Sequence, residues 1–333
     1  MQLHAASIGE AVPRENFDAV IQSVFESAVN LRLAGEDRLI TLLISESYEL
    51  PQGIRVTDKN FPLQSLIVDL HAASRGGILR FESSPLTVDL RGAPIWKCPI
   101  PELGADMGSP PVQKAWSIAW ELLNLQQGLR KTDILADDLF QINTGSSLSR
   151  RMSKPVMGLV ASTEQFDTDN AIRAAEKMIG LGPGVTPSGD DILIGFLAGL
   201  WSTAGQDQRQ SLFIRSFGAE LVQRARQTSE ISRTYIFHAA QGQFSSSLSH
   251  LVESITAGDE VEEAAQTAMR VGHSSGMDSV TGLLIGLCVW NSALGGVLAA
   301  EDGGGIISKT ALTPTLYPFG HTSQRERGNQ DGA

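Results

Sequence analysis

The chain has 333 residues, of which 42% are hydrophobic and 19% are charged, and its formal net charge is -11 at pH 7. This length accommodates two domains, each with its own hydrophobic core. The negative charge argues against nucleic-acid binding, because recognition of phosphates requires a basic face.

Several features indicate the cytoplasm. The first residues lack the basic start and apolar stretch of a secretory signal. Cys98 and Cys288 lie far apart without a metal-type spacing, which fits free thiols in a reducing compartment. The uncharged run at 279–300 is long enough to span a bilayer, but its glycines and acidic flanks favour a buried helix followed by a loop. We therefore expect a cytoplasmic protein with no membrane segment.

The first hundred residues predict a β-rich region. Short apolar, partly alternating runs indicate strands, and turn signals containing Gly, Pro and Ser separate them. A helix is predicted before them, over about 17–31. The runs predicted as strands are 39–45, 64–70, 78–82 and 86–90. We expect an antiparallel β-rich domain over 1–105.

The hydrophobic period then changes to that of helices. Val112, Trp116, Ala119 and Leu123 recur at helical spacing, and a Pro-Pro pair suits the helix start. A mainly helical domain is expected over 106–312, with a Ser-rich loop at 143–153. The polar residues 313–333 predict a loose tail. The expected fold class is therefore α+β.

One pattern occurs twice in the helical part. "SGDDILIGFLAG" begins at Ser188 and "SGMDSVTGLLIG" begins at Ser275, and both read S-G-x-D-x-x-x-G-x-x-x-G. Upstream, "AAEKMIGLG" (174–182) matches "AAQTAMRVG" (264–272), with a loop three residues longer in the first copy. The pattern predicts a duplicated unit of helix, glycine loop and glycine-spaced helix.

A structural interpretation explains much of this unit. Ser followed three residues later by Asp is a variant of the capping box, so Asp191 and Asp278 would bond free backbone N–H groups. Asp in a first turn also complements the helix dipole. Glycines four residues apart share one helix face and allow another helix to approach closely. Two well-capped helices crossing in a core would need no ligand.

A ligand-binding interpretation stays open beside it. Asp190 is a carboxylate that capping does not need, and a helix start preceded by glycine favours anions. If the two copies face each other across a pseudo-twofold axis, both starts would line one pocket. The polar groups available there are Gly184, Thr186, Ser188, Gly189, His273, Ser274, Ser275 and Gly276.

Between the copies, Arg233 is either a clamp for phosphate or carboxylate or a solvated side chain on an ordinary helix. His238 is interpreted as a packed or surface histidine rather than a ligand. The sequence contains no P-loop pattern, G-x-x-x-x-G-K-[ST].

Three motifs together resemble the AllH-like family, which includes the AllH subunit of bacterial oxamate carbamoyltransferase. They are "GLGPGVTPSGDDILIGFLAGL", "TSEISRTYIFHAAQGQF" and "GHSSGMDSVTGLLIGL", all between Gly180 and Leu287. The resemblance implies a cytoplasmic subunit that works with AllF- and AllG-like partners. Their reaction converts oxalurate and phosphate into oxamate and carbamoyl phosphate during the use of allantoin nitrogen.

This reaction assigns roles to the candidate residues. Asp190, Asp191, Asp278 and His273 become candidate catalytic groups, because a carbamoyl NH2 needs a carboxylate acceptor. The residues at the helix starts and Arg233 become candidates for phosphate binding. No cofactor is implied.

Two alternatives from other classes stay open. One is a metal-assisted hydrolase in which Asp190, Asp191 and Asp278 bind Mg²⁺ through oxygen, although neighbouring helical residues point about 100° apart. The other is a non-catalytic scaffold whose motifs only pack helices.

Overall fold

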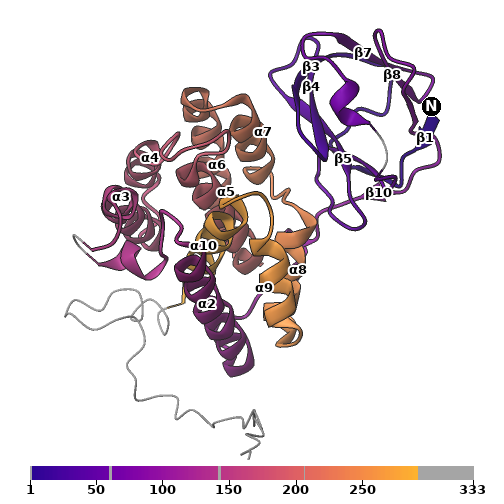
Figure 1. The fold of residues 1–333 in the computed structure, drawn as a ribbon. Helices are drawn as coiled ribbons and strands as arrows, with labels where there is room; N and C mark the ends of the chain where they lie inside the picture. The colour runs from indigo at the N-terminus through magenta and orange to yellow at the C-terminus, as the bar shows by residue number, and fades with distance from the viewer. Residues whose placement is uncertain (1, 60–61, 142–143, 206, 292–333) are drawn as a thin grey trace, which may run out of the picture.

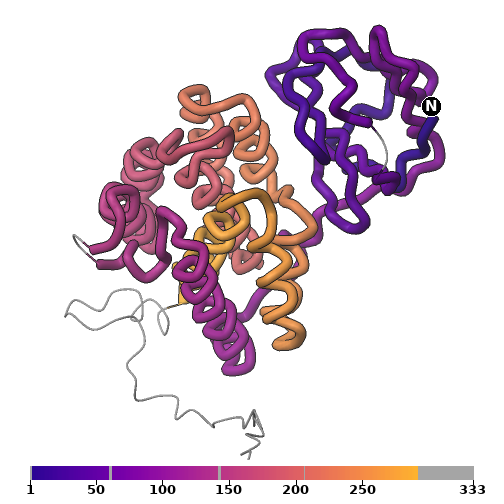
Figure 2. The backbone as a smooth tube through the Cα atoms, viewed as in Figure 1, coloured from indigo at the N-terminus to yellow at the C-terminus, as the bar shows by residue number. Residues whose placement is uncertain are grey.

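The computed structural model describes residues 2–59, 62–141, 144–205 and 207–291. Within them, a β-rich region over 2–96 is followed by a mainly helical region (Figure 1), which confirms the predicted fold class. The two regions lie side by side, and each has a hydrophobic core of its own (Figure 2). The predicted tail at 313–333 and the end of the uncharged run, 292–300, lie outside the described residues. Across the part that is described, no helix combines the length and the apolar character needed to cross a membrane.

The β-rich region is one curled, mixed sheet of ten strands in the described chain (Figure 1). Its order is β1-β9-β8-β7-β3-β4-β5-β6-β2-β10. Most neighbours are antiparallel, but β1–β9, β5–β6 and β2–β10 are parallel. The strands are β1 (Gln2–His4), β2 (Ser7–Gly9), β3 (Phe17–Val24), β4 (Ala28–Leu33), β5 (Leu39–Ile44), β6 (Gly53–Val56), β7 (His71–Arg75), β8 (Ile78–Phe81), β9 (Thr87–Asp89) and β10 (Ile95–Trp96).

The helix predicted over 17–31 is wrong, because this segment forms β3, a turn and most of β4. Phe17, Ala19 and Ile21 are buried and alternate with half-buried residues, which is the period of a strand. The segment pairs with β7, far along the chain, and this tertiary pairing overrides the local helical signal.

The strand predicted at 64–70 is also wrong. The 3-10 helix η1 (Leu63–Ser65) is followed by an irregular stretch in which Ile67 is 61% exposed. Leu63 and Leu66 are buried in the sheet core, so the apolar run is divided between core and surface. The strands predicted near 39–45, 78–82 and 86–90 are confirmed as β5, β8 and β9.

The helical region is arranged around α5 and α10, which lie at its centre (Figure 1). Its described elements are α1 (Ile100–Leu103), α2 (Pro110–Arg130), η2 (Asp137–Phe140), α3 (Ser147–Glu164), α4 (Thr168–Glu176), α5 (Ser188–Ala204), α6 (Gln208–Arg224), η3 (Ala225–Gln227), α7 (Glu230–Ala239), α8 (Ser246–Ala257), α9 (Val261–Met269) and α10 (Ser275–Cys288). The loop predicted at 143–153 is wrong from Ser147 onward, because Ser146 accepts a hydrogen bond from Ser149 N–H and caps α3.

α5 and α10 cross with their backbones in contact. A Cβ atom at Gly195 would lie 1.9 Å from the Ser279 carbonyl oxygen, and one at Gly282 would lie 2.0 Å from the Ile192 carbonyl oxygen. Both glycines therefore allow an approach that any side chain would prevent. This crossing places the first turns of the two helices close together.

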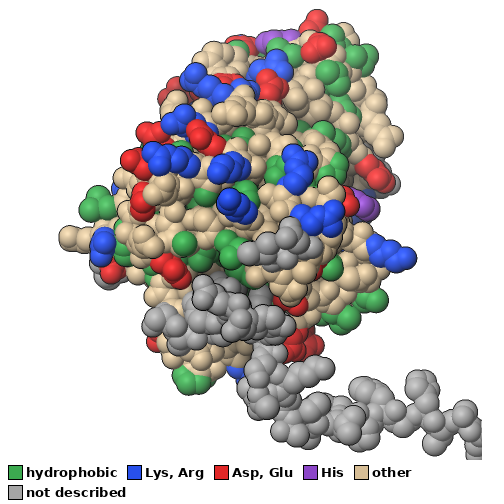
Figure 3. Space-filling view, turned by 90° about the vertical axis from the view of Figure 1, so that its left-hand side faces the viewer, with side chains coloured by type: hydrophobic (Ala, Val, Ile, Leu, Met, Phe, Trp, Pro, Cys, Tyr) green, Lys and Arg blue, Asp and Glu red, His purple; other side chains and the backbone are tan. Residues whose placement is uncertain are grey.

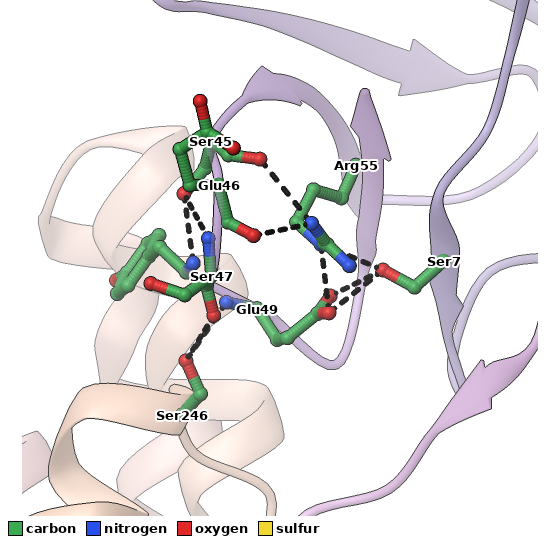
Figure 4. A network of polar contacts seen from close by, with 8 residues as sticks. Ser7, Ser45, Glu46, Ser47, Glu49, Arg55 and Ser246 are labelled. Carbon is green, nitrogen blue, oxygen red and sulfur yellow. Dashed lines mark hydrogen bonds and ion pairs between the residues drawn. The ribbon is translucent and has the colours of Figure 1, made fainter. Parts of the chain in front are cut away.

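A polar network joins the sheet to the helices (Figure 4). Glu49 N–H donates to Ser246 Oγ at 2.8 Å, and Ser246 N–H donates to the Glu49 carbonyl at 3.0 Å. The Glu49 carboxylate accepts from Ser7 Oγ at 2.6 Å and from Arg55 Nε at 2.8 Å. These bonds hold the loop that carries Tyr48 against the helical region.

The outer face on the side of α3 and α4 carries charges of both signs (Figure 3). Lys and Arg side chains stand beside Asp and Glu side chains there. One such pair joins two helices, because Arg224 of α6 lies 3.1 Å from Glu176 of α4.

Candidate functional site

The first turn of α5 is built on the chain that precedes it. Gly189 N–H donates to the Leu181 carbonyl at 2.8 Å, and a Cβ atom at Gly189 would lie 2.0 Å from the Met178 carbonyl oxygen. Gly189 therefore permits a close backbone contact. Gly184 is exposed, with φ at +90°, and stands apart from the cavities described below.

The first turn of α10 is built in the same way. Gly276 N–H donates to the Val271 carbonyl at 2.9 Å, and a Cβ atom there would lie 2.3 Å from the Ala268 carbonyl oxygen. The two helix starts are linked directly, because the hydroxyls of Thr186 and Ser275 lie 2.7 Å apart.

Residues of both starts share cavities, but there are two of them rather than the expected single pocket. The first, the interdomain cavity, is about 220 Å³ and lies between the loop after β5 and helices α5, α7, α8 and α10. Its lining includes Tyr48, Leu50, Gln52, Thr186, Asp191, Tyr235, His238, Gln243, Ser245, Ser247, Ser275, Gly276 and Ser279.

The second, the α2 cavity, is about 400 Å³ and lies beside the C-terminal end of α2. Residues from the starts of α5 and α10 line it together with the segment that follows α2. Its lining is Arg130, Lys131, Thr132, Asp133, Ile134, Pro183, Ser188, His273, Ser274 and Asp278.

Asp191 and Asp278 each face one of these cavities. Their side chains are 4% and 2% exposed, and the Oδ2 atom of each is buried without a hydrogen-bond partner among the described residues. Neither helix start has a side-chain cap hydrogen bond. No hydrogen bond joins either carboxylate to a backbone N–H group among the described residues, so the predicted capping bonds are not formed.

Burial changes the protonation of both acids. Burial raises the pKa of Asp191 well above its usual value, the charge of Asp278 raises it further, and the Ser275 hydroxyl lowers it. Burial likewise raises the pKa of Asp278 to about 6, while the Ser188 and Ser274 hydroxyls lower it. Each acid thus interacts with a serine of the other helix. Both acids therefore hold their protons to a higher pH than an exposed aspartate does.

Asp190 belongs to neither cavity. It is fully buried, its Oδ1 accepts a hydrogen bond from Gly180 N–H at 2.8 Å, and its Oδ2 accepts one from the Thr228 hydroxyl. The carboxylate thus ties the loop before α5 to the loop before α7. Both oxygens already accept bonds within the protein, which gives Asp190 a structural role, and its catalytic role stays a prediction.

Arg233 lies away from the two cavities. Its guanidinium contacts Asp37 of the sheet region at 2.8 Å and Glu230 at 3.7 Å. A second pair across the same boundary joins Arg32 to Glu230 at 2.8 Å. Arg233 therefore helps to hold the two regions together in this structure.

His238 lines the interdomain cavity as a packed, uncharged side chain. Burial lowers its pKa to about 4, although its Nδ1 contacts Gln243 Oε1 at 2.9 Å. Burial raises the pKa of Tyr48 to about 12, so this hydroxyl also stays protonated. No Lys or Arg occurs among the described residues that line the interdomain cavity.

Arg130 and Lys131 were not anticipated as site residues. Both are exposed, line the α2 cavity, and make no ion pair with another described residue. The sequence shows only a basic pair after the helical run that begins near Pro110, and basic residues are common at helix C-termini. The sequence alone did not show that the C-terminal end of α2 lies beside the first turns of α5 and α10.

The described residues contain no group of three or more His, Cys, Asp or Glu side chains arranged to hold a metal ion. Asp190, Asp191 and Asp278 therefore do not form the oxygen cage that the hydrolase alternative requires. The site thus contains two buried acids, Asp191 and Asp278, each with an unpartnered oxygen and with hydroxyl groups nearby. Among the described residues, cations line only the α2 cavity of the two.

Two family models match the chain. One is described as oxamate carbamoyltransferase subunit AllH and matches residues 178–287, from the loop before α5 to α10. The other is the AllH family N-terminal domain and matches residues 4–95, which is nearly all of the sheet. Together they cover more than half of the chain. No solved structure matches it.

Proposed function

From the premise that the chain belongs to the AllH family, we propose that it is a subunit of an oxamate carbamoyltransferase and contributes a site to the reaction. The substrates are oxalurate and phosphate, used in the catabolism of allantoin nitrogen in the cytoplasm. AllF- and AllG-like subunits complete the assembly.

The reaction breaks one C–N bond and forms one C–O bond. A phosphate oxygen attacks the carbamoyl carbon of oxalurate, and the nitrogen of oxamate leaves with the electron pair of the broken bond. The leaving nitrogen takes up the proton that hydrogen phosphate gives up, so oxamate departs as a primary amide and carbamoyl phosphate remains. Catalysis therefore needs an acceptor for the carbamoyl NH2, a path for the phosphate proton to the leaving nitrogen, and positive charge for phosphate.

The observation that supports this role is the pair of buried, unpartnered Oδ2 atoms on Asp191 and Asp278. A buried carboxyl oxygen without a partner is costly, so such atoms mark a place where a ligand supplies the missing bond. Asp278, which lines the same cavity as Arg130 and Lys131, is the acceptor for the amide, and Asp191 marks a second ligand contact in the interdomain cavity. Both lie within the segment that matches the family model.

The two alternatives have less support. A metal-assisted hydrolase needs the three aspartates to converge, and they do not. A scaffold needs both acids to be satisfied within the fold, whereas each keeps a buried oxygen without a hydrogen-bond partner among the described residues and each residue lines a cavity.

The test is phosphate-dependent cleavage of oxalurate by the chain reassembled with its partner subunits. We expect Asp191→Asn and Asp278→Asn each to lower kcat about a hundredfold, the usual size of a lost transition-state interaction. Asp169→Asn, an exposed acid in the first turn of α4, is the matched control and should be fully active. Full activity of both site variants would refute the assignment, and an assembly that cannot cleave oxalurate would refute the function.

A further inference from the structure

We propose that the α2 cavity binds a small anion that also carries an unsubstituted amide, with Arg130 and Lys131 holding the anionic group and Asp278 accepting from the amide. The identity of the ligand as a carbamoyltransferase substrate rests on the proposed function. Oxamate and carbamoyl phosphate share this chemistry.

The α2 cavity differs from the interdomain cavity in the charged side chains that line it. Arg130 and Lys131 line the α2 cavity together with the acids Asp133 and Asp278, and neither cation forms an ion pair with another described residue. Among the described residues, the interdomain cavity has no Lys or Arg in its lining. A small anion therefore gains favourable contacts in the α2 cavity alone, although both cavities adjoin the same two helix starts.

Hydrogen bonds fix the position of the backbone that carries Arg130 and Lys131. Lys131 has φ at +54° and closes α2, with its N–H bonded to the carbonyls of Gln127 and Gly128. The buried Gln127 side chain donates to Thr281 Oγ1 of α10 at 3.1 Å and accepts from Ala136 N–H at 2.8 Å. The end of α2, the loop after it and α10 are thus held by a single side chain, which sets the cations against Asp278.

Asp278 restricts the chemistry of the anion that the α2 cavity can bind. Its carboxyl is 2% exposed and lines the cavity, and its Oδ2 has no partner among the described residues. A carboxylate beside a bare anion would repel it, so a suitable ligand must present a hydrogen-bond donor to Asp278. An amide NH2 next to a carboxylate or phosphate meets both requirements.

The helix starts add polar groups to the lining of the cavity. Ser188 begins α5 and Ser274 is the residue before α10, and both line the cavity. Free N–H groups of a first turn favour negative charge. They supplement the two cations, which carry the proposal together with the unpartnered Asp278.

The test is equilibrium binding to the full chain by titration calorimetry, with oxamate and inorganic phosphate as separate probes. We expect Arg130→Gln and Lys131→Gln each to weaken the binding of both probes tenfold or more. Lys114→Gln removes the same charge from an exposed position near the other end of α2 and should bind within twofold of the native chain. No binding of either probe, or an Arg130→Gln/Lys131→Gln double variant with native affinity, would overturn the proposal.

A third probe tests the amide. Pyruvate has the carboxylate of oxamate but a methyl group in place of NH2, so we expect it to bind at least tenfold more weakly. Equal affinity for the two would overturn the assignment of Asp278.

Turnover by the reassembled subunits is measured in parallel. If the assembly cleaves oxalurate while binding ignores Arg130 and Lys131, this inference fails and the proposed function stands. If the chain binds oxamate as expected but the assembly is inactive, the function fails and the anion site stands.

Discussion

The interdomain cavity and the α2 cavity are made from the same short pattern and differ in what surrounds it. Each has one buried Asp, from α5 or α10, and a nearby serine of the other helix. Around Asp191 the fold brings tyrosines and a neutral histidine. Around Asp278 it brings Arg130 and Lys131. A repeated motif therefore fixes the acid, whereas the neighbouring elements decide the charge of the ligand.

The contacts between α5 and α10 are reciprocal in the register of the sequence match. A Cβ atom at Gly195 would meet Ser279 and Leu283, and one at Gly282 would meet Ile192 and Phe196. This relation is the one expected of two units that face each other across a local twofold axis. The common origin of the two units by duplication stays a prediction.

The largest expected effect is on the crossing that both cavities share. Gly195→Ala and Gly282→Ala each place a methyl group within about 2 Å of a backbone carbonyl, which no rotamer change relieves. We expect each to lower the free energy of unfolding by about 3 kcal/mol or more. Chemical denaturation of the full chain measures this.

Gly128→Ala is the matched control, because Gly128 lies inside α2 and has no atom within 4 Å of its ideal Cβ. This change should leave stability unchanged or raise it by up to about 1 kcal/mol, since alanine favours helix. If Gly195→Ala and Gly128→Ala have the same stability, the crossing is looser than described.

The second prediction separates function from stability at the two acids. Asp278→Asn removes a buried carboxylate and should raise the free energy of unfolding at pH 8 by up to about 3 kcal/mol. The sign follows from the pKa, which is about 6 when folded and near 3.8 when unfolded. Between these values the folded state holds the additional proton, so native stability falls as pH rises through this window.

The Asn variant does not titrate, so the stability gap should be small at pH 4 and full above pH 6 or so. Asp191→Asn should act in the same direction, because the pKa of Asp191 is also raised. Urea unfolding across this pH range measures both. An Asp278→Asn chain less stable than the native one at pH 8 would restore the capping interpretation.

The third prediction concerns the acid that belongs to neither cavity. Asp190→Ala leaves Gly180 N–H and the Thr228 hydroxyl without their acceptor and should lower the free energy of unfolding by about 2 kcal/mol. In the reassembled enzyme, the folded fraction should retain the native KM for oxalurate. A raised KM with unchanged thermal stability would instead make Asp190 a ligand-binding residue.

The sequence predicted the sheet where the pattern was local. The runs that became β5, β8 and β9 are short and apolar, and turn signals separate them. Residues 17–31 carry apolar side chains that suit either period, and only the pairing of β3 with β7 decides between them. That pairing joins segments about fifty residues apart, so no local window contains it.

The residues of the candidate site also fall into those that a local sequence pattern predicts and those that only the tertiary structure brings in. Asp191, Asp278, Ser188 and Ser275 were predictable because the S-G-x-D pattern marks two helix starts within short windows of sequence. Tyr48 and Arg130 were not, because each reaches the site from an element distant in sequence. The role of Asp190 also depends on tertiary structure, since its partner Thr228 belongs to the loop before α7.

The smallest expected effect tests whether the two cavities act independently. Ser246→Ala removes the hydroxyl that accepts from Glu49 N–H and should lower the free energy of unfolding by about 1 kcal/mol. Ser147→Ala is the control, because Ser147 is likewise the first residue of a Ser-capped helix but is exposed. Oxamate affinity should stay native in both variants, since no residue of the sheet region lines the α2 cavity. Weaker oxamate binding in Ser246→Ala alone would mean that the loop carrying Tyr48 communicates with Asp278 through the α5–α10 crossing, and that the two cavities work as one site.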